Sequence, residues 1–223
     1  RFRDPAYDPG GRFSIPWQWG TTGIGYDPEA VGSDVTDWDG FDLDAVRGRS
    51  SFLDEARDAI GMALFRIGAD PNSTDPKVLD RARDLLIDMK KRVKTITSDY
   101  QDPLKSGELV LAQGFSGDVF QARDRAAEAK KGVEISYSIP KEGAVMWSDF
   151  MAIPKDAPHA EAAYAFLDYI LEPAVIGPIT NKVFYANGNA KAAPYIDDEI
   201  KKDKTVYPDA ATMKKLFAES TPS

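Results

Sequence analysis

The chain has 223 residues, 43% hydrophobic and 29% charged, which is enough apolar material for one large domain or two smaller lobes. Its formal net charge of −8 argues against a nucleic-acid-binding surface, because such a surface needs a basic patch. The chain has no cysteine and one histidine, His159, which excludes disulfides, thiolate metal sites and multi-histidine metal sites. We therefore expect no metal or other cofactor.

The first half of the chain alternates between strand and helix patterns. After a turn-rich aromatic start, the β-branched and apolar run at 21–26 (TTGIGY) predicts a strand. The acidic segment 27–50 predicts a loop with a short helical piece near 43–46. A short strand at 51–53 then leads into a helix over 55–67, capped by Asp54 and stopped by Gly68. The loop 70–75 (DPNSTD) superficially resembles a calcium loop. It lacks the central glycine and the final glutamate, so a capped turn is the favoured interpretation.

The alternation continues to about residue 138. The pattern predicts helices at 76–91, 103–106 and 116–130, and strands at 93–97, 108–113 and 133–138. Strands that alternate with helices in this way are typical of an α/β fold with a largely parallel sheet. From Pro140 the pattern changes to an apolar strand at 145–153, a loop at 184–194, and helices at 158–171, 172–181 and 209–218. No apolar run reaches the length that crosses a membrane, so we expect no membrane insertion.

Two places in the chain put a carboxylate beside a large aromatic side chain. Phe115 is followed by Asp118, and Trp147 is followed by Asp149. Asp149 lies inside the otherwise apolar strand 145–153, so we expect a buried carboxylate, which is costly there unless it is paired. The face of an aromatic ring attracts an organic cation and its methylene stem, while a carboxylate accepts the hydrogen bonds of an ammonium group. The pattern therefore predicts an amine-binding site.

Several motifs resemble those of the periplasmic polyamine-binding proteins that serve ABC transporters, especially the putrescine-binding branch. In chain order the matching pieces are TTGIGY (21–26), SFLD (51–54), DPNST (70–74), GFSGDVFQA (114–122), SIPKEGA (138–144) and VFYAN (183–187). The resemblance covers nearly the whole chain. It implies a type II periplasmic binding protein-like α/β fold, a periplasmic location, a polyamine ligand, an ABC permease as partner, and no enzymatic activity.

The resemblance also implies which residues contact the ligand. By position these are Asp58, Phe115, Asp118, Trp147, Asp149 and Tyr185. The putrescine binders of the family have Trp where this chain has Phe115 and Glu where it has Asp58, which leaves open which polyamine is preferred. We expect residues 1–140 to form the second lobe of a two-lobed clamp. Residues 141–223 would then form the returning strand, part of the first lobe and the C-terminal helices.

The family pattern includes an N-terminal segment before the region matching Arg1 and a helix after the region matching Ser223. The chain by itself is therefore expected to hold about half of the site and to bind polyamines very weakly. Two other functions stay open from the residues alone. One is a hydrolase that uses Asp118 and Asp149 as acid and base, and the other is the ligand-sensing lobe of a signalling system.

Overall fold

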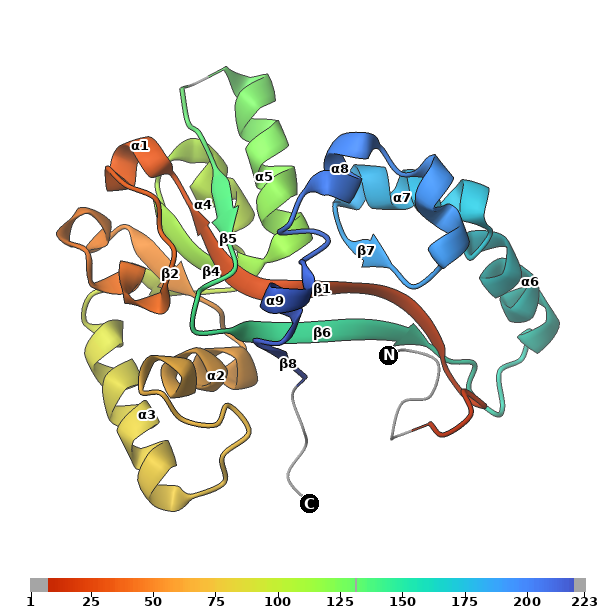
Figure 1. The fold of residues 1–223 in the computed structure, drawn as a ribbon, viewed down its shortest axis with the longest axis horizontal. Helices are drawn as coiled ribbons and strands as arrows, with labels where there is room; N and C mark the ends of the chain where they lie inside the picture. Colours follow the sequence, from red (N-terminus) through yellow and green to blue (C-terminus); the bar gives the residue numbers. More distant parts are fainter. Residues whose placement is uncertain (1–7, 131, 219–223) are drawn as a thin grey trace. The chain divides into compact units, whose positions relative to one another are not determined.

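The computed structural model describes residues 8–130 and 132–218, which form two compact units (Figure 1). Unit 1 contains the described residues up to Gly20 together with Ser148–Tyr207, and unit 2 contains Thr21–Trp147 together with the described residues from Pro208. This division differs from the predicted boundary at residue 140. Two of the boundaries fall inside the long strands β1 (Ile15–Tyr26) and β6 (Ala144–Met151), and no local sequence signal marks a division within a continuous strand. The assignment of the units to particular lobes stays a prediction.

The centre of unit 2 is a mixed sheet. Its strands lie in the order β3–β2–β4–β1–β6–β8, and β5 also pairs with β1. Apart from β1 and β6, these strands are β2 (Ser50–Phe52), β3 (Thr95–Ile96), β4 (Leu111–Phe115), β5 (Ser136–Ser138) and β8 (Leu216–Phe217). Strand β2 is parallel to β3 and β4, whereas β1 is antiparallel to both β4 and β5. The prediction of a largely parallel sheet therefore holds for the strands joined by helical crossovers but is wrong for β1, which pairs beside β4 in the opposite direction.

The predicted helices of unit 2 are present with small changes at their ends. They are α2 (Ala56–Arg66), α3 (Pro76–Lys90), α4 (Gln101–Ser106) and α5 (Ser116–Ala129), and Figure 1 shows them around the sheet. The Asp75 carboxylate accepts a hydrogen bond from the Lys77 N–H and so caps α3, while Gly68, just past the end of α2, has a positive φ of 67°. The predicted cap at Asp54 is wrong, because Glu55 occupies the N-cap position of α2 and makes no side-chain capping bond.

The acidic segment 27–50 is more ordered than the loop that its composition predicts. It contains the short helix α1 (Pro28–Val31), capped by Asp27, and the 3-10 helices η1 (Trp38–Asp42) and η2 (Asp44–Val46). Of these, only η2 was predicted, as the helical piece near 43–46. Trp38 is 1% exposed, and its indole Nε1 donates a hydrogen bond to the Gly143 carbonyl at 3.0 Å. Burial of this tryptophan ties the segment to the start of β6, because a buried indole N–H needs a partner.

Unit 1 is mainly helical. Its helices are α6 (Ala160–Ile170), α7 (Pro173–Val183) and α8 (Asp198–Lys202), followed in Figure 1 by colour from teal to blue. The predicted loop 184–194 contains strand β7 (Ala186–Asn187) and most of the 3-10 helix η3 (Ala190–Tyr195). Strand β7 pairs with the first half of β1, where Gln18 and Trp19 lie opposite Asn187 and Ala186. A two-residue strand of this kind exists only through its partner, which explains why the sequence pattern did not indicate it.

The predicted helix over 209–218 is wrong. Helix α9 spans only Ala210–Met213, and the chain then enters strand β8, which is parallel to β6 with Leu216 opposite Ala144. Leu216 is 5% exposed, and the Phe217 ring meets the Phe65 ring edge-on at 5.1 Å between centroids. Packing of these two side chains against β6 and α2 outweighs the weak helical preference of a short segment.

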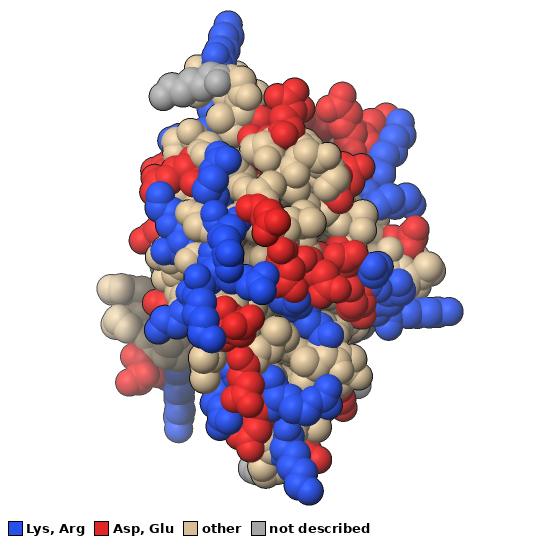
Figure 2. All heavy atoms as spheres, turned by 90° about the vertical axis from the view of Figure 1, so that its left-hand side faces the viewer, with Lys and Arg blue, Asp and Glu red and all other residues tan. Residues whose placement is uncertain are grey.

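Charges of both signs are interleaved on the side of the molecule shown in Figure 2. Ion pairs in unit 2 include Lys141 with Asp37 at 2.7 Å and Lys91 with Asp88 at 3.3 Å. Among the described residues no single helix is long and apolar enough to cross a membrane. Helices α6 and α7, which are bent by 72° relative to each other, pass that test only as a pair, by length and composition.

Candidate functional site

Two helices of unit 2 begin directly after two neighbouring parallel strands. Strand β2 leads through three residues into α2, and β4 leads directly into α5. In open α/β sheets, ligands bind outside the carboxyl ends of such strands, where the N–H groups of the helix starts are also presented. Asp58 lies in the first turn of α2 and Asp118 in the first turn of α5, so the fold brings two of the predicted carboxylates to this edge of the sheet.

Gln113 on β4 fixes the turn that leads to Asp58. This side chain is 1% exposed, its amide oxygen accepts a hydrogen bond from the Leu53 N–H at 3.2 Å, and its amide nitrogen donates to the Asp58 carbonyl at 3.0 Å. Both ends of the buried amide are therefore satisfied. The consequence is that strand β4 sets the position of the first turn of α2, although it lies more than 50 residues away in the sequence.

The Asp58 carboxylate is half-buried, and its surroundings disfavour the charged form. Its Oδ1 atom is buried, and apart from the Thr22 hydroxyl on β1 no group of the described residues is placed to donate a hydrogen bond to it. Burial raises the pKa of Asp58 above its ordinary value, the nearby Thr22 hydroxyl opposes that rise, and the negative charge of Glu55 adds to it. A buried carboxylate with so few hydrogen bonds is suited to accept one from a cationic group.

The GFSGD motif (114–118) is arranged around the buried ring of Tyr100. The Tyr100 hydroxyl accepts a hydrogen bond from the Phe115 N–H at 2.8 Å and donates to the Asp118 carboxylate at 3.4 Å. Burial raises the pKa of Tyr100 far above its ordinary value, and the charge of Asp118 adds to this effect, so the hydroxyl stays protonated and able to donate. A Cβ at Gly114 would lie 2.6 Å from the Tyr100 ring, which explains why this position is glycine.

Phe115 and Trp147 form an aromatic pair. Their ring centroids are 5.8 Å apart with an angle of 87° between the ring planes, an edge-to-face arrangement. Both side chains are partly exposed, and Phe115 directly precedes the helix that carries Asp118. Phe115, Asp118 and Trp147 therefore all belong to unit 2, with Asp58 on the neighbouring helix, and their contact with a ligand stays a prediction.

Asp149 and Tyr185 belong to unit 1. Asp149 lies near the end of β6 with an exposed side chain, which corrects the expectation that it is a buried carboxylate in an apolar strand. The apolar neighbours in the sequence indicated burial, but alternate side chains of a strand point to opposite faces, so they do not determine the environment of Asp149. Although the side chain is exposed, the protein atoms around it still raise the pKa of Asp149 above its ordinary value. Tyr185 is partly buried and follows Phe184, which ends α7 in a left-handed conformation with φ of 60°.

Three residues at the candidate site were missed from the sequence: Thr22, Tyr100 and Gln113. Thr22 lies opposite Phe115 in the pairing of β1 with β4, and all three side chains are at most 1% exposed. For Gln113 a signal was available, because a glutamine inside the apolar run LAQGF has to find partners if the strand is buried. Nothing in the local sequence connects Tyr100 with Asp118.

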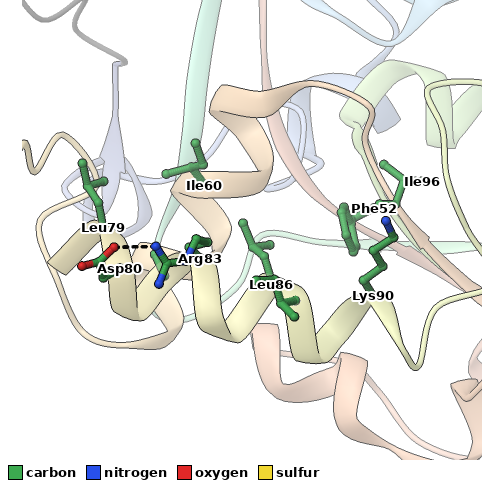
Figure 3. A pocket seen from close by; sticks show the side chains of 10 residues that line it. Phe52, Ile60, Leu79, Asp80, Arg83, Leu86, Lys90 and Ile96 are labelled. Carbon is green, nitrogen blue, oxygen red and sulfur yellow. Dashed lines mark hydrogen bonds and ion pairs between the residues drawn. The ribbon is translucent and has the colours of Figure 1, made fainter. Parts of the chain in front are cut away.

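A groove of unit 2 that is lined mainly by residues of α3 does not fit an amine ligand. It has a volume of about 480 Å³, and Figure 3 shows Ile60, Leu79, Leu86 and Phe52 along it. Its one acidic group, Asp80, is already paired with Arg83 at 2.7 Å. None of the six predicted ligand-binding residues lines this groove. Its apolar wall offers no free carboxylate to an ammonium group.

The loop 70–75 adopts the capped-turn form. The Asp70 carboxylate accepts a hydrogen bond from the Asn72 N–H at 2.9 Å, and the Asp70 carbonyl accepts one from the Ser73 N–H at 2.9 Å. Within residues 8–130 and 132–218 no group of three or more histidine, aspartate or glutamate side chains is placed to hold a metal ion.

Comparison with known proteins places this geometry in a family. Residues 5–208 match the model of the bacterial extracellular solute-binding proteins. The chain is 38% identical to the putrescine-binding periplasmic protein SpuD of Pseudomonas aeruginosa over 94% of its own length, and 38% identical to the putrescine-binding periplasmic protein PotF of Escherichia coli over 95%. It spans 60% of the length of each of these curated relatives.

A solved structure agrees with the sequence comparison. The spermidine/putrescine ABC transporter substrate-binding protein PotD of Streptococcus pneumoniae superposes with a TM-score of 0.85 and 29% identity, covering 99% of this chain and 67% of that protein. The fold is accordingly the type II α/β fold of periplasmic solute-binding proteins. With six motifs in order, the matched strands and helices, and these relatives, the chain belongs to the family of bacterial extracellular solute-binding proteins.

Proposed function

We propose that the protein containing this chain is a periplasmic solute-binding protein that captures a polyamine of the putrescine or spermidine type and delivers it to an ABC permease. The observation that carries the proposal is the pair of carboxylates, Asp58 and Asp118, at the ends of neighbouring parallel strands beside the Phe115–Trp147 pair. Relatives named for putrescine binding support the same ligand class. Because the chain spans 60% of their length, the ligand and partner of the whole protein are part of the proposal.

The chemistry of the site follows from these groups. The carboxylates accept charge-assisted hydrogen bonds from the ammonium ends of the ligand, and the aromatic faces contact its methylene stem. Asp149 and Tyr185 complete the proposed set of ligand-binding residues. When an ammonium group approaches Asp58, it favours the charged carboxylate, so ligand binding lowers the raised pKa of that side chain.

The proposal includes that the protein binds its polyamine ligand without changing it chemically. The hydrolase alternative needs Asp118 and Asp149 as an acid and base pair. The relatives named above are binding proteins. A sensing role in signalling would use the same ligand chemistry, and transport of labelled putrescine in a strain lacking the gene separates it from delivery to a permease.

Calorimetric titration of the longer protein tests the ligand class. We expect putrescine or spermidine to bind and 1,4-butanediol, which has no charge, to give no heat, because charge-assisted hydrogen bonds dominate the affinity. Equal binding of the diol would contradict the proposal, and so would turnover of a glycoside under the same conditions. The 223-residue chain alone is expected to bind putrescine very weakly, since enclosure by protein strengthens each electrostatic contact.

Two substitutions test the role of the carboxylates. Asp118→Asn and Asp149→Asn in the longer protein are each expected to weaken polyamine binding by about 2–4 kcal/mol, because the ammonium group loses its counter-charge. Asp156→Asn, at an exposed turn position after β6, is the matched control and should leave affinity unchanged. An unchanged affinity in either site variant would remove that residue from the ligand-binding set.

A further inference from the structure

The segment that carries Tyr185 is held in place by its neighbours rather than by its own conformation. Tyr185 lies between Phe184, which ends α7, and the two-residue strand β7 (Figure 1). Phe184 has a φ of 60°, a left-handed conformation that is usual for glycine at a helix end but uncommon for a bulky residue. Such a conformation persists only where the surrounding structure holds it. A strand of two residues also needs outside support.

A single buried residue of α7, Thr180, holds both neighbours of Tyr185. The Thr180 carbonyl accepts a hydrogen bond from the Phe184 N–H at 2.8 Å. Its hydroxyl accepts a second hydrogen bond from Nδ2 of Asn187 at 3.0 Å. Thr180 is 0% exposed, so water cannot replace either bond. The chain before Tyr185 and the chain after it are therefore fixed to the same residue of the same helix.

Both ends of the Asn187 side-chain amide are hydrogen-bonded. While the amide nitrogen donates to Thr180, the amide oxygen accepts a hydrogen bond from the Asn189 N–H at 2.9 Å. The backbone of Asn187 lies opposite Gln18 in the pairing of β7 with β1, and all of these residues belong to unit 1. Loss of the Thr180 hydroxyl would leave the Asn187 amide nitrogen without this partner and release one end of the segment.

We infer that Thr180 is a positioning residue of the ligand site, and that its hydroxyl, through Asn187, fixes Tyr185 in the orientation in which its ring contacts the polyamine. The inference rests on the proposed role of Tyr185 in ligand binding. An aromatic side chain on a fixed segment needs little ordering when the ligand arrives, whereas a loose segment has to be immobilised at a cost in affinity. Thr180 is itself buried and acts through its neighbours.

Calorimetric titration of the longer protein with putrescine tests the inference. Thr180→Val keeps the shape of the side chain and removes the hydroxyl, so the affinity is expected to fall roughly 3- to 10-fold. Thr180→Ser is the conservative rescue: it keeps the hydroxyl and should restore affinity to within about twofold of the parent, although the lost methyl group lowers Tm. Ile176→Val is the matched control, because it truncates a 0% exposed side chain one turn earlier on α7 and should lower Tm without changing affinity.

A double-mutant cycle shows whether Thr180 acts through Tyr185. Tyr185→Ala should weaken binding, and adding Thr180→Val to it should weaken binding no further, because the ring that Thr180 positions is gone. Hydrogen exchange of the unliganded protein gives a readout that does not depend on putrescine. Thr180→Val should speed the exchange of amides 184–188 roughly tenfold or more and leave those of α8 unchanged.

Three outcomes would overturn the inference. The first is an equal loss of affinity for Thr180→Ser and Thr180→Val, because the loss would then follow stability rather than the hydroxyl. The second is an additive loss in the Tyr185→Ala background, or no effect of Tyr185→Ala itself. The third is unchanged exchange of amides 184–188 in Thr180→Val. A parent protein that binds no putrescine would contradict the proposed function, and the exchange measurement would still decide whether Thr180 fixes the segment.

Discussion

The Tyr100 hydroxyl makes hydrogen bonds to two residues of the candidate site, Phe115 and Asp118. Tyr100 is 0% exposed, and its oxygen accepts a hydrogen bond from the Phe115 N–H while its proton points to the Asp118 carboxylate. Tyr100→Phe removes the oxygen and keeps the ring that packs against Gly114. The substitution therefore tests whether this hydroxyl connects β4 with the start of α5.

The expected cost can be worked out from the two hydrogen bonds. Loss of the 2.8 Å bond leaves the backbone N–H of Phe115 without its partner, and an unsatisfied, partly buried donor costs about 1–3 kcal/mol of unfolding free energy. The bond to Asp118 is long, at 3.4 Å, and adds little to stability. The larger effect on Asp118 is positional, because its carboxylate loses the group that orients it, so polyamine affinity of the longer protein should fall as well.

Urea unfolding followed by circular dichroism measures the first effect. With a slope near 2 kcal/mol/M, the midpoint of the unit 2 transition should fall by roughly 0.5–1.5 M, and amide exchange should be faster in β4 and α5 than in α3. The control is Tyr164→Phe, which removes a hydroxyl from a tyrosine that is 60% exposed and should leave the midpoint unchanged. A midpoint for Tyr100→Phe equal to that of the control would refute the reasoning.

Two other predictions concern unit 2. Gly114→Ala should lower the free energy of unfolding by about 1–3 kcal/mol, because the new Cβ would lie 2.6 Å from the Tyr100 ring. The control is Gly61→Ala within α2, whose new Cβ would have no contact shorter than 3.6 Å and which should be neutral or stabilising. Equal urea midpoints for the two variants would contradict the packing argument. The raised pKa of Asp58 means that the folded protein holds this proton to a higher pH than the unfolded chain, so ionisation costs stability as pH rises above the ordinary value of 3.8. Asp58→Asn should therefore be more stable than the parent at pH 7, and this gain should disappear near pH 3; the same gain at both pH values in urea unfolding would count against the effect of burial.

Local sequence patterns were sufficient to predict the main helices of unit 2. Helices α2, α3 and α5 begin and end within about two residues of the predicted positions, because their apolar spacing and terminal residues act within one or two turns. The α/β class was also predicted, whereas the edge-to-face contact between Phe115 and Trp147, at 5.8 Å between ring centroids, is a tertiary contact that the sequence did not indicate.

Contacts between distant residues were decided by the tertiary structure. The antiparallel placement of β1, the two-residue strands β7 and β8, and the division of the chain within β1 and β6 all depend on which strands become neighbours. A two-residue segment has too few residues to show a period, so its conformation is set by its partner rather than by its own sequence.

The same distinction applies to the candidate site. The sequence determined that carboxylates and aromatic rings occur together around residues 115–118 and 147–149, and this composition already indicates an amine ligand. Only the folded structure brought Gln113 to the Asp58 carbonyl and Tyr100 to Asp118, and only it exposed the side chain of Asp149. Residue chemistry is a property of each position, whereas burial and hydrogen-bond partners arise when segments far apart in the chain pack against each other.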